Sequence, residues 1–384
     1  MYAPSGLVVI VDPSVLGSST FANRFRPQDK VFLNEKISDR ATAEKILGIV
    51  VSTKLRARLP VVVLLSNLDT ATSANLLAIA SRFNAPATMI TTDNALSVNY
   101  QSTSGFSLII TQENFSGYLW GDLSYLEDKI DVVGDVHGQL KTLNRLVASL
   151  GYIGLLGTSS FRHPDNRLLV FVGDLIDKGP FPVEVLDVVQ KSTVLGQCLS
   201  VRGNHEHKLA GVLNRVCSKA NTSVKALLAV EIKKSRPSRR KTLKSLANLV
   251  DTSNFNRLSK LREFLTAMPL LLTFGKIVVV HAAFSPELLE EPVEPRKRNQ
   301  RSRWLLNGPG RVINGVWEPT NWTAAYSGNS TVVHGHTSSA CSKTVNNAGG
   351  MVISLDSGAG EGISLTACSF RASGEKFTTA EVEL

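Results

Sequence analysis

The chain has 384 residues and a hydrophobic fraction of 43%, which is enough for two domains with ordinary cores and excludes a disordered or fibrous protein. No stretch reaches eighteen uninterrupted apolar residues, and the N-terminus lacks the features of a signal peptide, so we expect no membrane span and a cytoplasmic location. The net charge of +10 indicates attraction to anions without naming the anion. The spacing of the cysteines predicts reduced thiols rather than disulfides or a zinc site: Cys198, Cys217, Cys341 and Cys368.

Two basic runs, within residues 233–244 and 296–303, contain no acidic residue. Each run fits a solvated surface, and each also fits a surface that contacts the phosphates of a polyanion. For the first run the two interpretations are left open. For the second we favour contact with phosphates, because it leads into a candidate phosphate-binding arginine.

The first hundred residues alternate between predicted strands and helices. Leu7–Val11 is a β-branched run typical of a buried parallel strand, and residues 12–20 follow it in the place of a phosphate-binding P-loop. The next expected elements are a helix over 40–59, a strand over 61–65, a helix over 75–83 and a strand over 87–90. This order predicts an α/β domain with a doubly wound, P-loop-like sheet.

Polar side chains follow the apolar runs in the rest of the chain, in most cases directly after a glycine. The sites are, in chain order, Gly134-Asp135-Val136-His137, Gly173-Asp174-Leu175-Ile176-Asp177, Gly203-Asn204-His205-Glu206, His281 and Gly335-His336. A single aspartate in a glycine turn is more often a turn residue than a ligand. Five such sites in order, with carboxylate, amide and imidazole groups at the ends of strands, predict a site for two metal ions.

These motifs resemble those of the calcineurin-like metallophosphoesterases, in particular the phosphoprotein-phosphatase branch, from Ile130 to about Phe370. The resemblance implies an α+β fold in which helices flank a β-sandwich, with 351–360 and 363–367 as the family's terminal strand pair. It also implies six ligands for two divalent metal ions: Asp135, His137, Asp174, Asn204, His281 and His336. Such mixed ligands favour Mn²⁺ over Mg²⁺, with Fe, Ni or Zn as alternatives.

The same resemblance implies the roles of the residues around the metals. His205 would protonate the leaving oxygen, and Asp177 would orient its imidazole. Lys178, Arg202 and Arg303 are the candidate contacts to the substrate phosphate. Lys178 stands where the family usually has arginine, so a planar two-pronged contact becomes a point charge. A structural ion pair is the alternative for Arg202.

The N-terminal residues and the junction are similar to those of bacterial polynucleotide kinase-phosphatases. Residues 105–110 resemble the last strand of that kinase, and residues 118–122 resemble its connector to the phosphatase. Ser18 stands in place of the P-loop lysine, and Glu35 and Ser38 stand where the family's catalytic aspartate and an arginine are expected. A domain altered in this way lacks much of the electrostatic stabilisation that phosphoryl transfer requires, so we expect an inactive kinase-like domain that does not bind ATP.

The predicted organisation is a degenerate P-loop kinase-like domain (1–115), a linker (116–129) and a calcineurin-like domain (130–384) with a helical insertion (207–268). The leading hypothesis is a dinuclear metal-dependent phosphoesterase that removes phosphate monoesters, or opens cyclic phosphates, at RNA or DNA ends. The alternatives are a serine/threonine protein phosphatase or a dinucleoside-polyphosphate hydrolase. A nucleic-acid-binding scaffold is the alternative from another class, but a scaffold would not need all six ligands.

Overall fold

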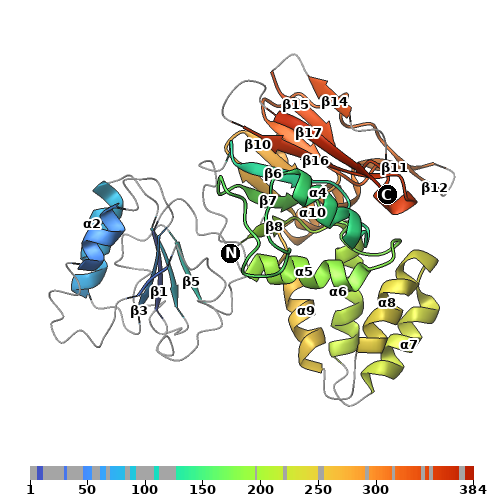
Figure 1. Ribbon diagram of the computed structural model, residues 1–384, viewed down its shortest axis with the longest axis horizontal. Coiled ribbons are helices and arrows are strands. Elements are labelled where there is room, and N and C mark those ends of the chain that lie inside the picture. Colours follow the sequence, from blue (N-terminus) through green and yellow to red (C-terminus); the bar gives the residue numbers. More distant parts are fainter. Residues whose placement is uncertain are drawn as a thin grey trace. The chain divides into compact units, whose positions relative to one another are not determined.

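The structure is a computed structural model, shown in Figure 1. The N-terminal residues that it describes are 7–11, 30–32, 46–53, 61–65, 70–82, 87–91 and 108–111. From residue 127 to the end, the description is interrupted only at 195–196, 219–222, 250–254, 290–293, 314–315, 339–341, 346–348 and 372–376. The chain divides into two compact units, with the change near residue 126. Within the described ranges no helix combines the length and apolarity needed to cross a membrane.

The N-terminal unit contains a five-stranded sheet in the order β2-β3-β1-β4-β5, and every neighbouring pair in it is parallel. Its strands are β1 (Leu7–Val11), β2 (Lys30–Phe32), β3 (Val61–Leu65), β4 (Ala87–Thr91) and β5 (Leu108–Thr111). Residues 46–53 are helical, and helix α2 spans Thr70–Arg82. The parallel sheet explains why these strands read as continuous β-branched runs, since parallel sheets are normally covered on both faces. The predicted P-loop residues, 12–20, lie outside the described residues.

The C-terminal unit contains two mixed five-stranded sheets, in the orders β17-β16-β6-β7-β8 and β14-β15-β13-β10-β9. The strands of the first sheet are β6 (Ile130–Val133), β7 (Leu168–Phe171), β8 (Cys198–Ser200), β16 (Ser364–Phe370) and β17 (Phe377–Glu383). Those of the second are β9 (Leu271–Phe274), β10 (Ile277–Val280), β13 (Thr331–His334), β14 (Ser342–Val345) and β15 (Met351–Ser354). A hairpin of β11 (Gly310–Ile313) and β12 (Val316–Pro319) forms a separate two-stranded sheet.

Within each of these two sheets, three neighbouring strands run parallel. They are β6, β7 and β8 in one sheet and β10, β13 and β15 in the other, while the outer strands β9, β14, β16 and β17 pair antiparallel. The parallel strands are almost completely buried, with β6, β7, β8 and β10 buried at every residue. This arrangement matters for the site because parallel strands present their carboxyl ends at the same edge of a sheet.

Two helices of this unit pack on different sheets. Helix α4 (Leu140–Ser149) packs on β16 and β17 of the first sheet, while α10 (Pro295–Asn307) contributes Leu305 and Leu306 to an apolar cluster with Val278, Val280 and Val332 of the second. Four other helices lie together at the lower edge of Figure 1: α6 (Asn204–Cys217), α7 (Val224–Lys234), α8 (Pro237–Leu249) and α9 (Phe255–Ala267). Helix α5 (Pro182–Val194) and the short 3-10 turns η4 (Pro286–Leu288) and η5 (Ala359–Glu361) complete the unit.

The structure differs from the sequence prediction in three places. The predicted terminal strand pair does not form, because β15 pairs with β13 and β14 while β16 pairs with β6 and β17 in the other sheet. The helical insertion begins earlier than 207, since α6 starts within the third motif at Asn204. Helix α2 starts at Thr70 rather than at residue 75, so the polar residues before Asn75 form its first turns.

A buried ion pair fastens the first strand of the C-terminal unit to its neighbours. Arg167 donates from Nε and Nη2 to the two carboxylate oxygens of Asp131, over 2.9 and 2.8 Å, and both side chains are almost fully buried. Arg167 also donates to the carbonyls of Asp128, Ile130 and Phe370, so all three nitrogens of its guanidinium group donate hydrogen bonds. The pair therefore links β6 to β16 as well as to the segment before β7.

We expect Asp131→Ala to lower the free energy of unfolding by about 3–5 kcal/mol, because it leaves the Arg167 charge buried without its partner. Urea denaturation measures this loss. Asp165→Ala is the matched control, since the Asp165 side chain is 76% exposed and a surface substitution should change stability by less than about 0.5 kcal/mol. An equally small effect of both substitutions would contradict the conclusion that the ion pair of Arg167 and Asp131 stabilises the fold.

Candidate metal centre

The predicted ligands come together at the carboxyl ends of the parallel strands of both sheets. Asp135 and His137 follow β6, Asp174 follows β7, and Asn204 stands at the start of α6, just after β8. From the other sheet, His281 follows β10 directly and His336 follows β13. The Nδ1 atom of His281 donates to the carbonyl oxygen of Val172 over 3.0 Å, which joins the strand ends of the two sheets.

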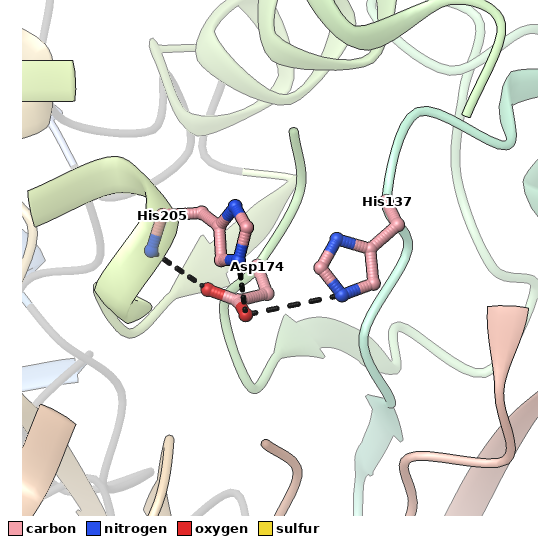
Figure 2. A group of neighbouring side chains, drawn as sticks. All are labelled: His137, Asp174 and His205. Atoms are coloured by element: carbon pink, nitrogen blue, oxygen red, sulfur yellow. Dashed lines mark hydrogen bonds and ion pairs between the residues drawn. The ribbon is translucent and has the colours of Figure 1, made fainter. Parts of the chain in front are cut away.

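Asp174 lies at the centre of the site (Figure 2). Its Oδ2 is 3.9 Å from Nε2 of His137 and 3.8 Å from Nε2 of His205, and its Oδ1 is 3.4 Å from Nε2 of His281. Two groups that can hold a metal ion share this carboxylate. One is His137, Asp174 and His205, the other is Asp174, His281 and His336, and within each the ligand atoms lie within 4.8 Å of one another. A carboxylate shared in this way is what a pair of bridged cations needs.

The imidazole groups of His137 and His281 are fixed in the form that binds metals. Nδ1 of His137 donates to the carbonyl of Ile176 over 3.0 Å, and Nδ1 of His281 donates to that of Val172. In both rings the proton is therefore on Nδ1, and the lone pair of Nε2 points toward Asp174. Burial lowers the pKa of both rings, that of His281 to about 3. Both imidazoles are therefore neutral near pH 7, as a metal ligand must be.

Asp135 provides a direct test of whether a cation fits. Its Oδ2 accepts a hydrogen bond from the backbone N–H of His336 over 3.1 Å, but its buried Oδ1 has no hydrogen-bond partner among the residues that the structure describes. Burial, together with the charges of Asp356 and Asp174, raises the pKa of Asp135 well above its ordinary value. A divalent cation would supply the missing partner and neutralise the crowded carboxylates, so the residues present fit such an ion.

Asn204 lies on the side of the site formed by the second sheet. Its Nδ2 is 3.0 Å from Nδ1 of His336, which in turn is 3.2 Å from Nε2 of His281. Lys208, one turn further along α6, donates from Nζ to Oδ1 of Asn204 over 3.2 Å. All six predicted ligands therefore lie in one cluster around Asp174, although their coordination of metal stays a prediction.

His205 and Asp177 form a close pair beside this cluster. Nδ1 of His205 is 2.6 Å from Oδ2 of the fully buried Asp177, and Nε2 of His205 faces Asp174. Asp177 is held from helix α8, because Thr242 donates to its Oδ1 over 2.5 Å and Nε of Arg239 lies 3.4 Å from its Oδ2. Burial lowers the pKa of His205, but the carboxylates of Asp174 and Asp177 outweigh burial and raise it overall.

The motif glycines permit close approach of backbone to the ligands. A Cβ atom on Gly203 would collide with the carboxylate and amide nitrogen of Asp174, and one on Gly335 would collide with Oδ1 of Asp135. Several neighbouring residues also adopt a positive φ that side chains disfavour: His137 (45°), Asp174 (47°), Asp177 (70°), Lys178 (53°) and His336 (73°). Backbone strain of this kind concentrates at functional sites, where the surrounding structure fixes the geometry.

Sequence reasoning missed Glu206, which fixes the second and third motifs to each other. Its Oε2 accepts from the backbone N–H groups of Asp174 and Gly203 over 2.8 and 3.0 Å, and its Oε1 accepts from Leu175 over 2.9 Å. Burial and the charge of Asp174 raise the pKa of Glu206 to about 8. Its place directly after Asn204 and His205 was the signal that could have found it.

Other residues that support the site also escaped the sequence analysis. Asp356 is buried just after β15, so it follows a strand as the other motif residues do, although here the glycine, Gly358, comes after the carboxylate. Burial raises the pKa of Asp356 to about 6. Thr242 and Arg239 gave no signal, because only folding brings α8 to Asp177.

The three predicted phosphate-binding residues occupy different environments. Lys178 forms an ion pair with Glu361, with Nζ 2.7 Å from Oε1. Within the described part of the chain, the buried Nε of Arg202 has no hydrogen-bond partner. Arg303 is exposed on α10, one turn before Asn307, whose backbone lies near enough to His336 to oppose the lowering of that ring's pKa by burial. Contact of any of them with phosphate stays a prediction.

A cluster of buried carboxylates and imidazoles at facing strand ends is the arrangement that a hydrolytic metal centre requires. The chain belongs to the calcineurin-like phosphoesterase family, whose model matches residues 128–340, and it is therefore a metallophosphoesterase. This confirms the predicted class of enzyme and the calcineurin-like fold of residues after 127.

Proteins similar to this chain include two bacterial enzymes named asymmetrical bis(5'-nucleosyl)-tetraphosphatase PrpE. The one from Oceanobacillus iheyensis is 29% identical over 253 residues, which cover 63% of this chain and 88% of the relative. The one from Bacillus velezensis is 31% identical over 251 residues, which cover 62% and 88%. A solved protein serine/threonine phosphatase from Saccharomyces cerevisiae is 15% identical, with a TM-score of 0.40 and coverage of 68% and 81%. These relatives are not named as polynucleotide kinase-phosphatases, so that part of the predicted resemblance is not shown.

Proposed function

We propose that this protein hydrolyses the phosphoanhydride bonds of dinucleoside polyphosphates at a pair of divalent cations. The observation that carries the proposal is the position of Asp174, shared by two groups of ligands and flanked by the His205–Asp177 pair. The choice of substrate is supported by the relatives named as tetraphosphatases, which this chain matches over 88% of their length. Dinucleoside polyphosphates were one alternative in the sequence analysis, and we now prefer them to nucleic-acid ends.

The proposed cations would be held by Asp135, His137 and Asp174 on one side and by Asp174, Asn204, His281 and His336 on the other. Bound there, they would lower the pKa of water and polarise the phosphoryl oxygens, with Mn²⁺ preferred for these mixed ligands. His205 donates a proton from Nε2 to the leaving oxygen, and Asp177 holds the ring through Nδ1 so that Nε2 faces the reaction. Glu206 keeps the backbone of Asp174 in place.

Phosphate removal at nucleic-acid ends is the second candidate. The observation that favours it is the basic first half of α10, where Arg296, Lys297 and Arg298 are exposed, while the other end of this helix reaches His336 through Asn307. A strand whose terminal phosphate lay at the metals could follow this helix, and its binding would weaken with salt.

For the N-terminal unit we propose an inactive kinase-like domain. The proposal is supported by the all-parallel order β2-β3-β1-β4-β5 and by Ser18 in place of a P-loop lysine. Ser18 itself lies outside the described residues, so this proposal rests on the sequence at that position.

A substrate comparison tests the proposed function. With Mn²⁺ we expect faster hydrolysis of diadenosine tetraphosphate than of a phosphoserine peptide or of RNA ending in a 3'-phosphate. Dialysis against a chelator should remove all three activities, and Mn²⁺ should restore them. Preferred hydrolysis of the RNA at low salt would select the second candidate, and activity that survives chelation would contradict the metal centre.

A further inference from the structure

Residues of α6, α7 and α8 and of the α7–α8 connection line a pocket of about 790 Å³ that is open to solvent. This volume lies within the range of pockets that bind small molecules and cofactors. One part of its wall is apolar and is formed by Val212, Val216 and Leu227. The other part is strongly basic, and its cations include Lys208, Lys234, Arg236 and Arg239.

The charge of the pocket is poorly balanced by the protein itself. Among the described residues that line it, Glu231 is the only carboxylate, and it forms an ion pair with Arg215 at 2.7 Å. Five cations line the same pocket: Lys208, Arg215, Lys234, Arg236 and Arg239. The N-terminus of α8, which begins at Pro237 beside Arg236, adds its positive end and has no acidic residue in its first turn. A multivalent anion would relieve this repulsion.

Two of these cations connect the pocket to the catalytic residues. Lys208 contacts Asn204, with Nζ 3.2 Å from Oδ1, and Arg239 contacts Asp177, with Nε 3.4 Å from Oδ2. Asp177 binds the ring of His205, which protonates the leaving oxygen. The pocket therefore adjoins both Asn204, in the second group of proposed ligands, and Asp177, which orients His205.

We propose that this pocket binds the nucleoside polyphosphate that leaves during hydrolysis. Its phosphates contact Lys208, Lys234 and Arg236, and its nucleoside packs against Val212, Val216 and Leu227. In the step itself, a bond forms between phosphorus and the oxygen of the attacking water while the bond from phosphorus to the bridging oxygen breaks. The bridging oxygen keeps the electron pair and takes the proton of His205, while the attacking water releases a proton to solvent. This inference rests on the proposed function and specifies where the substrate lies.

Lys234→Ala combined with Arg236→Ala tests the pocket without touching the metal centre. In the Mn²⁺-loaded enzyme we expect the KM for diadenosine tetraphosphate to rise about tenfold, since two charge-assisted contacts to phosphate are lost. Hydrolysis of p-nitrophenyl phosphate, whose leaving group carries no phosphate, should stay within about twofold. Lys241→Ala combined with Lys244→Ala is the matched control on α8, because both lysines are exposed and neither lines the pocket.

Inhibition by ATP separates this inference from the proposed function. ATP should inhibit hydrolysis of p-nitrophenyl phosphate competitively, and the pocket variant should weaken that inhibition about tenfold while the control leaves it unchanged. If the enzyme fails to hydrolyse diadenosine tetraphosphate but shows this pattern, the proposed function fails and the pocket assignment stands. An unchanged KM and unchanged inhibition in the pocket variant would overturn the assignment. Equal losses of activity on diadenosine tetraphosphate and p-nitrophenyl phosphate would also overturn it. The same holds for stronger competition by a 3'-phosphorylated oligonucleotide than by ATP.

Discussion

Asp174→Asn is expected to lower kcat/KM by about 10³-fold or more, because it removes the charge shared by both groups of candidate ligands. Asp174 is the one carboxylate common to both groups of candidate ligands, and its Oδ1 also accepts the backbone N–H of His205 over 3.0 Å. Asparagine keeps the volume and an oxygen for that hydrogen bond but removes the charge. It also tolerates the positive φ of 47° at this position, where alanine would add backbone strain.

The metal content of the purified variant is the second measurement, because a lost bridging carboxylate should reduce the bound metal as well as the rate. Elemental analysis of Mn²⁺-loaded protein measures it directly. Thermal unfolding provides the control for folding, and Asp165→Ala provides the matched loss of an exposed carboxylate. Near-normal activity of Asp174→Asn with a full complement of metal would exclude Asp174 as the bridging group.

The ligands of the centre could be predicted from the sequence because each follows an apolar strand, in most cases after a glycine. Asp135, Asp174 and His336 lie where parallel strands end, and the structure places all three together. The same rule could have found Asp356, which follows β15 and lies close enough to Asp135 for its charge to raise the pKa of that carboxyl. Asp356 was missed because the segment was interpreted only as a terminal strand.

Residues that act on the site from a distance could not be predicted. Thr242 lies 65 positions from Asp177, and the apolar spacing that predicts α8 does not say which of its side chains turns toward the site. The helical insertion was predicted as a cover over one side, but its roles in holding Asp177 and in forming the basic pocket depend on packing. The sheet assignment of β15 and β16 depends on tertiary pairing in the same way.

The packing of the helical insertion places the cations of the first basic run, residues 233–244, in three different environments. Arg239 contacts Asp177, whereas Lys234 and Arg236 line the pocket, and Lys241 and Lys244 are exposed away from it. Residues that form one run of like charges in the sequence thus have different surroundings in the fold: one lies beside Asp177, two line the pocket proposed to bind a ligand, and two face solvent. The non-helical connection at Ser235 and Arg236, between the end of α7 at Lys234 and the start of α8 at Pro237, separates the cations of one helix from those of the next.

His205→Gln should lower kcat by about 10²–10⁴-fold on a substrate with a poor leaving group, because the leaving oxygen then departs without a proton. The bound metal should be unchanged, since the carboxylate, amide and imidazole groups of the six proposed ligands remain. Asp177→Asn should give a smaller loss, because it disturbs the 2.6 Å contact that orients the His205 ring but leaves the ring in place.

The dependence on the leaving group distinguishes an acid from a structural residue. With p-nitrophenyl phosphate, whose leaving oxygen needs little protonation, His205→Gln should lose much less activity than with an alkyl phosphate. Thr242→Val removes only the hydrogen bond to Oδ1 of Asp177, so we expect the same pattern in weaker form. Equal losses of His205→Gln on the aryl and alkyl substrates would show that His205 binds metal or phosphate instead of donating the proton. That result would assign His205 to the ligand group that it forms with His137 and Asp174.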